Sequence, residues 1–250
     1  MKSKILILSL ALTAMMIGVP SQAQRVLDVS VKPRAEINSE MYGIFFEDIN
    51  FGADGGLYAE LVKNRSFEFD YSLMGWTPFG RVSVETERPA FVRNPHYVRL
   101  TGGDDYKKSG LQNDGFIDGM GMEVGAEYRL SFYARVQSGA PEKLRFELIT
   151  VDNNIMTAKE IEVSSLEWEK QTLLLKARKD DAHARLRMTL LSSGTIDVDH
   201  ISLFPIDTWK GRENGLRKDL AQALSDLHPG VLRFPGGCIV EGTTLATRYQ

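Results

Sequence analysis

Cysteine, excess charge and long hydrophobic runs are all scarce in this 250-residue chain. The single cysteine, Cys238, excludes an intramolecular disulfide and a zinc site built from several cysteines. The formal net charge of −3 argues against a nucleic-acid partner, because general nucleic-acid binders need a basic surface to displace counterions. What is present, 43% hydrophobic and 25% charged residues, is typical of a globular protein with one large or two modest domains.

Residues 1–23 have the pattern of a secretory signal peptide. Two lysines precede an apolar run over residues 5–19, and small residues occupy the −3 and −1 positions of a cleavage site after Ala23. The run is shorter than the roughly 20 residues that a membrane-spanning helix needs. We therefore expect an exported chain, periplasmic or extracellular, that begins near Gln24 and has no membrane partner after cleavage. A retained membrane anchor is the alternative.

The part that follows contains two predicted strands and a predicted helix. Residues 25–31 alternate between apolar and polar side chains, which predicts a strand within an N-terminal segment 24–40. Residues 42–47 are a continuous apolar run ending in a carboxylate, which is typical of a strand buried on both faces. Apolar residues at helical spacing after Asp54, a suitable N-cap, predict a helix up to about residue 65.

Residues 71–206 have a different character. Short alternating runs separated by Gly, Asn and Asp indicate strands, most clearly at 128–136, 144–148, 186–190 and 196–199. No helical pattern interrupts them. The segment is therefore predicted to be an all-β sandwich of roughly 130 residues and a domain of its own.

Helical spacing returns in residues 207–250. Leucines at 216, 220, 224 and 227 share one face of a predicted helix that Asn214 could cap, and residues 231–234 form a short apolar strand. Together with residues 41–70, this gives strand and helix, an inserted sandwich, then helix and strand. That order indicates the opening of a parallel α/β fold. Only about 80 residues lie outside the sandwich and signal peptide, whereas a closed eightfold barrel takes about 250.

The candidate functional residues lie at the ends of the two apolar strands. Glu47 and Asp48 end the first strand, and because adjacent side chains point to opposite faces, at most one of them faces a given site. Helix capping or a surface ion pair is the alternative for both. Arg233 in the second strand needs a partner if it is buried, either a carboxylate or a hydroxylated ligand. Gly236–Gly237 would admit a ligand to the backbone or make a tight turn, and Cys238 fits a packing residue better than a nucleophile.

Two groups in the sandwich could bind ligands. One or two of its aromatic side chains could stack on sugar rings, although most aromatic residues of a sandwich belong to its core. Four loop aspartates could ligate a structural calcium, although solvated loop acids are the simpler reading. The four histidines have no ligand spacing, so no other metal or cofactor is expected. The aromatic candidates are Trp76, Phe79, Phe91, Tyr97, Tyr106 and Phe116, and the aspartates are Asp104, Asp105, Asp114 and Asp118.

Four long blocks carry a family resemblance. Residues 41–50 (MYGIFFEDIN) and 55–68 (GGLYAELVKNRSFE), with 211–220 (GRENGLRKDL) and 232–242 (LRFPGGCIVEG), strongly resemble α-L-arabinofuranosidases of glycoside hydrolase family 51. Within the sandwich, YRLSFYAR (from residue 128) and IDVDHISLFP (from residue 196) resemble carbohydrate-binding jelly rolls of the 4/9 type. The resemblance covers essentially the whole mature chain.

The resemblance implies a mixed fold. Its expected form is an incomplete (β/α)8 barrel, with the first two strands and helices in residues 41–70 and 207–250, interrupted by the jelly roll of 71–206. Residues 24–40 would contribute their strand to a second β-sandwich.

The resemblance also implies an activity and roles for three residues. The activity is hydrolysis of terminal non-reducing α-L-arabinofuranosyl groups from plant cell-wall polysaccharides, by a retaining mechanism with two carboxyl groups. Glu47 matches a glutamate that binds arabinose hydroxyls, Arg233 matches an arginine that orders the active-site carboxylates, and Cys238 occupies a position that is Asn in other members. Both catalytic glutamates are expected beyond residue 250, so the chain alone is expected to be inactive. The expected partner is an arabinose-containing polysaccharide or oligosaccharide, with homo-oligomers common at full length. The alternative is a non-catalytic polysaccharide-binding protein.

Overall fold

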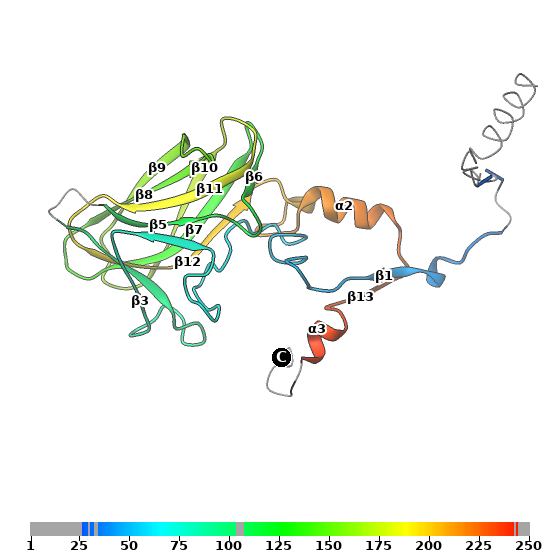
Figure 1. Ribbon diagram of the computed structural model, residues 1–250, viewed down its shortest axis with the longest axis horizontal. Coiled ribbons are helices and arrows are strands. Elements are labelled where there is room, and N and C mark those ends of the chain that lie inside the picture. Colours follow the sequence, from blue (N-terminus) through cyan, green and yellow to red (C-terminus); the bar gives the residue numbers. More distant parts are fainter. Residues whose placement is uncertain (1–26, 30, 33–34, 104–107, 243, 245–250) are drawn as a thin grey trace, which may run out of the picture. The chain divides into compact units, whose positions relative to one another are not determined.

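The computed structural model describes residues 27–29, 31–32, 35–103, 108–242 and 244 (Figure 1). The predicted signal peptide, residues 1–23, lies outside this range. Among the described residues, no helix is both long and apolar enough to cross a bilayer.

Residues 76–205 form two antiparallel sheets, which confirms the predicted sandwich (Figure 1). The five-stranded sheet has the order β10 (Glu169–Lys176), β7 (Glu127–Val136), β12 (Thr195–Pro205), β4 (Tyr97–Thr101) and β3 (Arg81–Glu85). The second sheet has the order β2 (Trp76–Phe79), β5 (Ser109–Asn113), β11 (Asp181–Leu190), β8 (Glu142–Ile149) and β9 (Ile155–Val163), with β6 (Met120–Met122) also paired to β11.

The core lies between the two sheets. Alternate residues of β7 point inward, as their sequence pattern predicts, and Leu130, Phe132 and Ala134 are completely buried. The Phe132 ring packs on Phe146 of β8, with ring centroids 4.7 Å apart. Contacts of this kind between the inner faces hold the two sheets together.

Residues 59–70 are also part of the sandwich, although they precede the expected boundary at residue 71. Val62 and Phe67 belong to its core, and Leu61 N–H donates to the carbonyl of Leu203 in β12 at 3.0 Å. The predicted helix over 54–65 is wrong, because the N–H groups of residues 56–58 make only turns and the backbone of Ala59 and Leu61 donates to distant segments. Ala59 N–H, for example, donates to the Gly215 carbonyl.

The remaining elements surround a parallel strand pair. β1 (Gly43–Phe45) pairs with β13 (Val231–Arg233), which confirms both predicted strands and their parallel direction. The other elements are the 3-10 turns η1 (Ser39–Met41) and η2 (Trp209–Gly211), and the helices α2 (Lys218–Asp226) and α3 (Cys238–Glu241). Helix α2 confirms the helical spacing, but it begins after Arg217 instead of Asn214, which has a positive φ of 48°.

Two expectations about burial and strand formation are wrong. β1 is not buried on both faces, because no layer among the described residues covers it, and Phe45 is 55% exposed. Residues 27–29 and 31, the described part of the predicted strand 25–31, form no strand, and Val31 is fully open to solvent. An alternating segment becomes a strand only when a neighbouring strand accepts its backbone hydrogen bonds, and the described residues offer none here.

Candidate functional sites

Strand pairing brings the first predicted site together. Phe45 lies opposite Arg233 in the β1–β13 register, and Phe46 N–H donates to the Arg233 carbonyl at 3.0 Å. Asp48 N–H then donates to the Pro235 carbonyl at 3.1 Å, so pairing continues past both strand ends. Glu47 consequently lies beside the turn that carries Gly236 and Gly237.

Glu47 and that turn fit closely together. Gly237 N–H donates to Glu47 Oε1 at 3.3 Å. Gly236 has a φ of 134°, and a Cβ at this position would come within 2.6 Å of Glu47 Cγ, so the contact requires glycine. A Cβ on Gly237 would lie 3.9 Å from Arg233 Nη2 and 4.0 Å from Glu47 Oε1. Glu47 and Arg233 therefore face the same small space.

Two residues near this space differ from their expected surroundings. The Arg233 side chain is exposed instead of buried, and its guanidinium lies over the Phe45 ring, 5.0 Å from the centroid. Because β13 is uncovered, solvent removes the need for a buried partner. Cys238 is exposed at the start of α3, so the packing role expected for it is not found.

Asp48 has a structural role. Its Oδ1 accepts a hydrogen bond from Ala53 N–H at 3.1 Å and thereby closes the loop after β1. This matches the alternative in which one of the paired carboxylates caps local structure.

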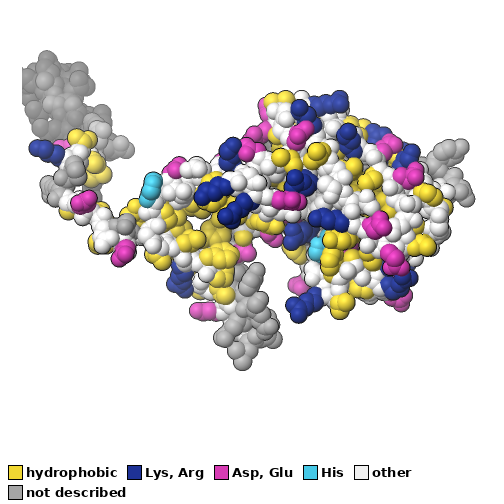
Figure 2. Space-filling view, turned by 180° about the vertical axis from the view of Figure 1, so that it is seen from behind, with side chains coloured by type: hydrophobic (Ala, Val, Ile, Leu, Met, Phe, Trp, Pro, Cys, Tyr) yellow, Lys and Arg dark blue, Asp and Glu magenta, His cyan; other side chains and the backbone are white. Residues whose placement is uncertain are grey.

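An apolar hollow of about 460 Å³ lies next to the strand ends. Its lining includes Phe46, Leu57, Tyr58, Leu224, Leu232 and Phe234. The exposed apolar side chains of β13 and its neighbours continue this surface, whereas charged and apolar side chains are mixed over the sandwich (Figure 2). A surface this apolar is typical of an interface or of an uncovered core.

The sandwich has a groove of about 470 Å³ on the outer face of its six-stranded sheet. Two rows of side chains cross its floor, and strand register sets both. In one row Gln112, Arg187 and Glu147 are neighbours on β5, β11 and β8. In the other, Thr189 on β11 lies between Gly110 and Arg145. The missing side chain at Gly110 leaves the space into which the Phe79 ring turns, because a Cβ there would come within 2.4 Å of that ring.

Glu147 organises the charges of the groove. Arg187 Nε and Nη2 both lie 2.7 Å from its Oε2, and Arg145 Nε lies 2.9 Å from its Oε1. Only 6% of the Glu147 side chain is exposed. Two arginines therefore share one carboxylate, and both of its oxygens are occupied.

Of the five aromatic candidates that the structure describes, Phe79 alone lines this groove. Trp76 and Tyr97 are buried, as expected for most aromatic residues of a sandwich. Phe91 packs on Tyr133 and His200, and Phe116 packs on Phe51. Tyr106 lies outside the described residues.

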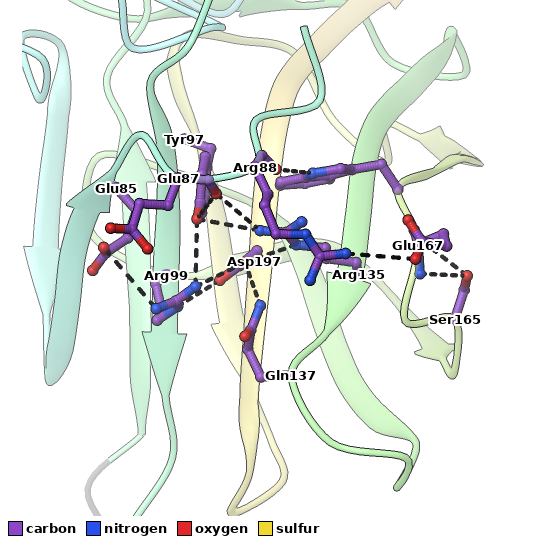
Figure 3. A network of polar contacts seen from close by, with 11 residues as sticks. Glu85, Glu87, Arg88, Tyr97, Arg99, Arg135, Gln137, Ser165, Glu167 and Asp197 are labelled. Carbon is purple, nitrogen blue, oxygen red and sulfur yellow. Dashed lines mark hydrogen bonds and ion pairs between the residues drawn. The ribbon is translucent and has the colours of Figure 1, made fainter. Parts of the chain in front are cut away.

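A polar network centred on Asp197 occupies the outer face of the other sheet (Figure 3). Arg99 Nε donates to Asp197 Oδ1 at 2.7 Å, and Arg135 Nε donates to Oδ2 at 3.0 Å. Gln137 donates to the same Oδ2, and hydrogen bonding to Asp197 raises the pKa of Arg99. Asp197 is completely buried, so this network fastens strands β4, β7 and β12 to one another and leaves no open site.

The Asp197 network could not be identified from the sequence. An aspartate between Ile196 and Val198 fits an ordinary outward position of a solvated strand. The segment between β3 and β4 covers this face, since Tyr97 Oη donates to the Glu87 carbonyl and Trp168 Nε1 donates to the Arg88 carbonyl.

The aspartates that could ligate calcium do not converge in the described part of the chain. Asp114 pairs with Arg185 at 3.2 Å and Asp118 with His183 at 3.4 Å, whereas Asp104 and Asp105 lie outside the described residues. No group of three His, Cys, Asp or Glu residues suited to a metal occurs among residues 27–29, 31–32, 35–103, 108–242 and 244.

Comparison with known proteins places this geometry in context. Residues 59–194 match the family described as a carbohydrate binding domain. An extracellular exo-α-L-arabinofuranosidase of Streptomyces chartreusis is 37% identical over 88% of this chain and 27% of its own length. α-L-Arabinofuranosidase 2 of Arabidopsis thaliana is 35% identical over 90% of this chain and 35% of its own.

A solved structure agrees with both relatives. An arabinose-bound GH51 α-L-arabinofuranosidase superimposes with a TM-score of 0.75 at 29% identity, over 88% of this chain and 38% of that one. The chain thus spans between about a quarter and two-fifths of the length of these proteins.

Proposed function

Because the chain belongs to the carbohydrate-binding domain family through residues 59–194, and is homologous to α-L-arabinofuranosidases over about nine-tenths of its length, we propose that it is the N-terminal portion of such an enzyme. The enzyme would be exported, with residues 1–23 as its signal peptide. It would remove terminal non-reducing α-L-arabinofuranosyl groups from arabinose-containing polysaccharides.

The parallel pairing of β1 with β13 is the observation that carries this proposal. It brings Glu47 and Arg233, from residues far apart in sequence, to the same strand ends. Parallel barrel enzymes put their working groups at this end of their strands. The exposed apolar faces of the strand pair and the apolar hollow beside it support an incomplete barrel, which further strands and helices would cover.

Each of the two side chains has a chemical task in this proposal. A glutamate carboxylate accepts hydrogen bonds from sugar hydroxyls, so Glu47 would hold the arabinofuranosyl ring. The Arg233 guanidinium would pair with the active-site carboxylates and fix their orientation. The retaining mechanism needs two carboxyl groups about 5–5.5 Å apart, which we expect on later strands of the barrel, beyond residue 250.

The proposal is tested on the full-length enzyme with Glu47→Gln. Losing hydrogen bonds to a charged acceptor should lower kcat/KM for an arabinofuranoside by roughly 10- to 100-fold. Asp48→Asn is the matched control, because Asn can still accept from Ala53 N–H, and it should change kcat/KM little. Equal effects of the two variants would contradict the role of Glu47. The 250-residue chain by itself should release no arabinose.

The groove of the six-stranded sheet favours a second candidate, a polysaccharide-binding protein without chemistry. An aromatic ring beside polar side chains in an open groove suits a sugar ring, which has apolar C–H faces and hydroxyl edges. Retardation of the chain in native gels that contain plant polysaccharides tests binding. Binding together with an inactive full-length protein would favour this candidate.

A further inference from the structure

The groove on the six-stranded sheet carries more positive than negative charge. Its described lining contains Lys108, Arg145 and Arg187 but only one carboxylate, Glu147. We propose that this groove selects polysaccharides that carry uronic acid carboxylates. This inference rests on the proposed carbohydrate binding and adds the chemical class of the ligand.

The three cations are not equally available to a ligand. Arg187 directs both Nε and Nη2 to Glu147 and is held as part of the floor. Arg145 Nε lies 2.9 Å from Glu147 Oε1 without making a hydrogen bond, and its Nη1 lies 3.7 Å from Glu160, which is 45% exposed at the edge strand β9. A ligand carboxylate can replace such a loose contact with a short charge-assisted hydrogen bond.

Lys108 adds a flexible charge at the rim. Its side chain is exposed, and it makes no ion pair with any described residue. A neutral glycan would leave the Lys108 ammonium without a counter-charge from any described residue, and the outer edge of Arg145 with only its loose contact to Glu160. A glycan with a carboxylate supplies one to both, which is electrostatic complementarity of the kind that gives specificity.

The rest of the groove suits the sugar ring itself. Phe79, Ile155 and Leu191 form apolar walls, and Gln112 and Thr189 offer hydrogen bonds to hydroxyl groups. Gly110 lets the Phe79 ring lie against the floor, since a side chain there would collide with that ring and with the Met188 carbonyl. One ring can therefore stack in the groove while its carboxylate faces the cations.

The opposite face of the sandwich shows what a closed charge cluster looks like. There Arg99 and Arg135 are both directed at the fully buried Asp197, and the segment between β3 and β4 covers Arg135, whose side chain is only 4% exposed. In the groove Arg145 and Arg187 are 32% and 25% exposed, and Lys108 at the rim is exposed.

The experiment compares one polymer in two chemical forms. Binding of the 250-residue chain is measured by native affinity electrophoresis and calorimetry with glucuronoxylan, and with the same polymer after its carboxyl groups have been reduced to alcohols. Reduction should weaken binding about tenfold in 50 mM salt, because charge-assisted hydrogen bonds are lost. The difference should shrink as salt is raised to about 500 mM, since the site is open to solvent.

Three variants locate the effect. Lys108→Gln and Arg145→Gln should each weaken binding to the carboxylated polymer about threefold or more and leave the reduced polymer unaffected. Phe79→Ala should weaken both polymers about 3- to 10-fold, because stacking does not depend on the carboxylate. Lys170→Gln is the matched control: it removes the same charge from the exposed face of β10 in the other sheet and should change nothing.

The outcomes separate this inference from the proposed function. Equal binding of both polymers, weakened by Phe79→Ala, would overturn the uronate preference and leave carbohydrate binding in the groove intact. A carboxylate preference that Lys108→Gln and Arg145→Gln do not alter would overturn the assignment to this groove. Binding of neither polymer would overturn the inference together with carbohydrate binding by this domain.

Discussion

The two strands β7 and β13 are both rich in apolar residues, yet they have opposite environments. Leu130 and Phe132 of β7 are completely buried between two sheets, whereas Val231 and Leu232 of β13 are 58% and 61% exposed. The apolar pattern of a strand thus shows which side chains it could bury. Whether they are buried depends on the layers that surround the strand. The sandwich supplies its own layers within 59–205, and the β1–β13 pair has none among the described residues.

Truncating one aromatic side chain in each region should give the largest difference in the free energy of unfolding between the two regions. Phe132→Ala should lower the free energy of unfolding by about 3–5 kcal/mol, because it leaves a cavity against Phe146. Phe45→Ala should cost less than about 1 kcal/mol, since the ring is half exposed and loses mainly its contact with Arg233. Urea unfolding followed by circular dichroism measures both. Similar losses would show that β1 is buried as deeply as β7.

Charge pairs should show a somewhat smaller contrast. Asp197→Asn leaves Arg99 and Arg135 without their buried counter-charge and should cost about 3 kcal/mol. Asp219→Asn removes a solvent-exposed pair between Asp219 of α2 and Arg217, the residue before the helix, and it should cost less than about 0.5 kcal/mol. The same urea measurements apply. An unchanged free energy of unfolding in Asp197→Asn would mean that the network contributes nothing to holding β4, β7 and β12 together.

The two regions should also differ in the sign of the pH dependence of their stability. Burial raises the pKa of Asp199 to about 8, although His200 N–H donates to its Oδ1 at 2.6 Å. The folded state therefore holds a proton that the unfolded state releases above about pH 4, so stability falls as pH rises toward 8. Asp199→Asn should remove this slope, which is at most about 1.4 kcal/mol per pH unit.

Asp219 should give a pH dependence of stability with the opposite sign. The hydrogen bond from Arg217 lowers the pKa of Asp219, so its contribution is present above about pH 4 and is lost as the pH falls. Thermal unfolding between pH 3 and pH 9 resolves both variants. A slope between pH 5 and 8 that Asp199→Asn leaves unchanged would contradict the assignment to Asp199.

The sequence predicted those parts of the fold whose pattern is local. Alternation in 128–136 identified β7, and helical spacing identified α2. The helix expected over 54–65 failed because Leu61 bonds to Leu203, a choice that depends on a strand more than 140 positions away. The sequence also could not decide whether Arg233 is buried, since that depends on a covering layer, and none lies over it among the described residues.

The two candidate sites also differ in whether they could be predicted from the sequence. Glu47, Arg233 and the glycine turn could be found because each stands at the end of an apolar run. The groove could not, because Lys108, Arg145 and Arg187 come from three segments that only register aligns. Phe79 was one of six aromatic candidates, and no property of its sequence neighbours distinguished it from Trp76.

The chain enters and leaves the sandwich at neighbouring places, and this has a consequence for the order of folding. Tyr58 bridges to Leu216, so the sandwich receives and returns the chain at almost the same place. Before the sandwich forms, β1 and β13 must close a loop of about 190 residues. Once it has formed, the flexible part of that loop is about 30 residues, which lowers the entropic cost of closure by roughly 1.6 kcal/mol. Folding of the sandwich before the strand pair thus brings β1 and β13, which are distant in sequence, close to each other.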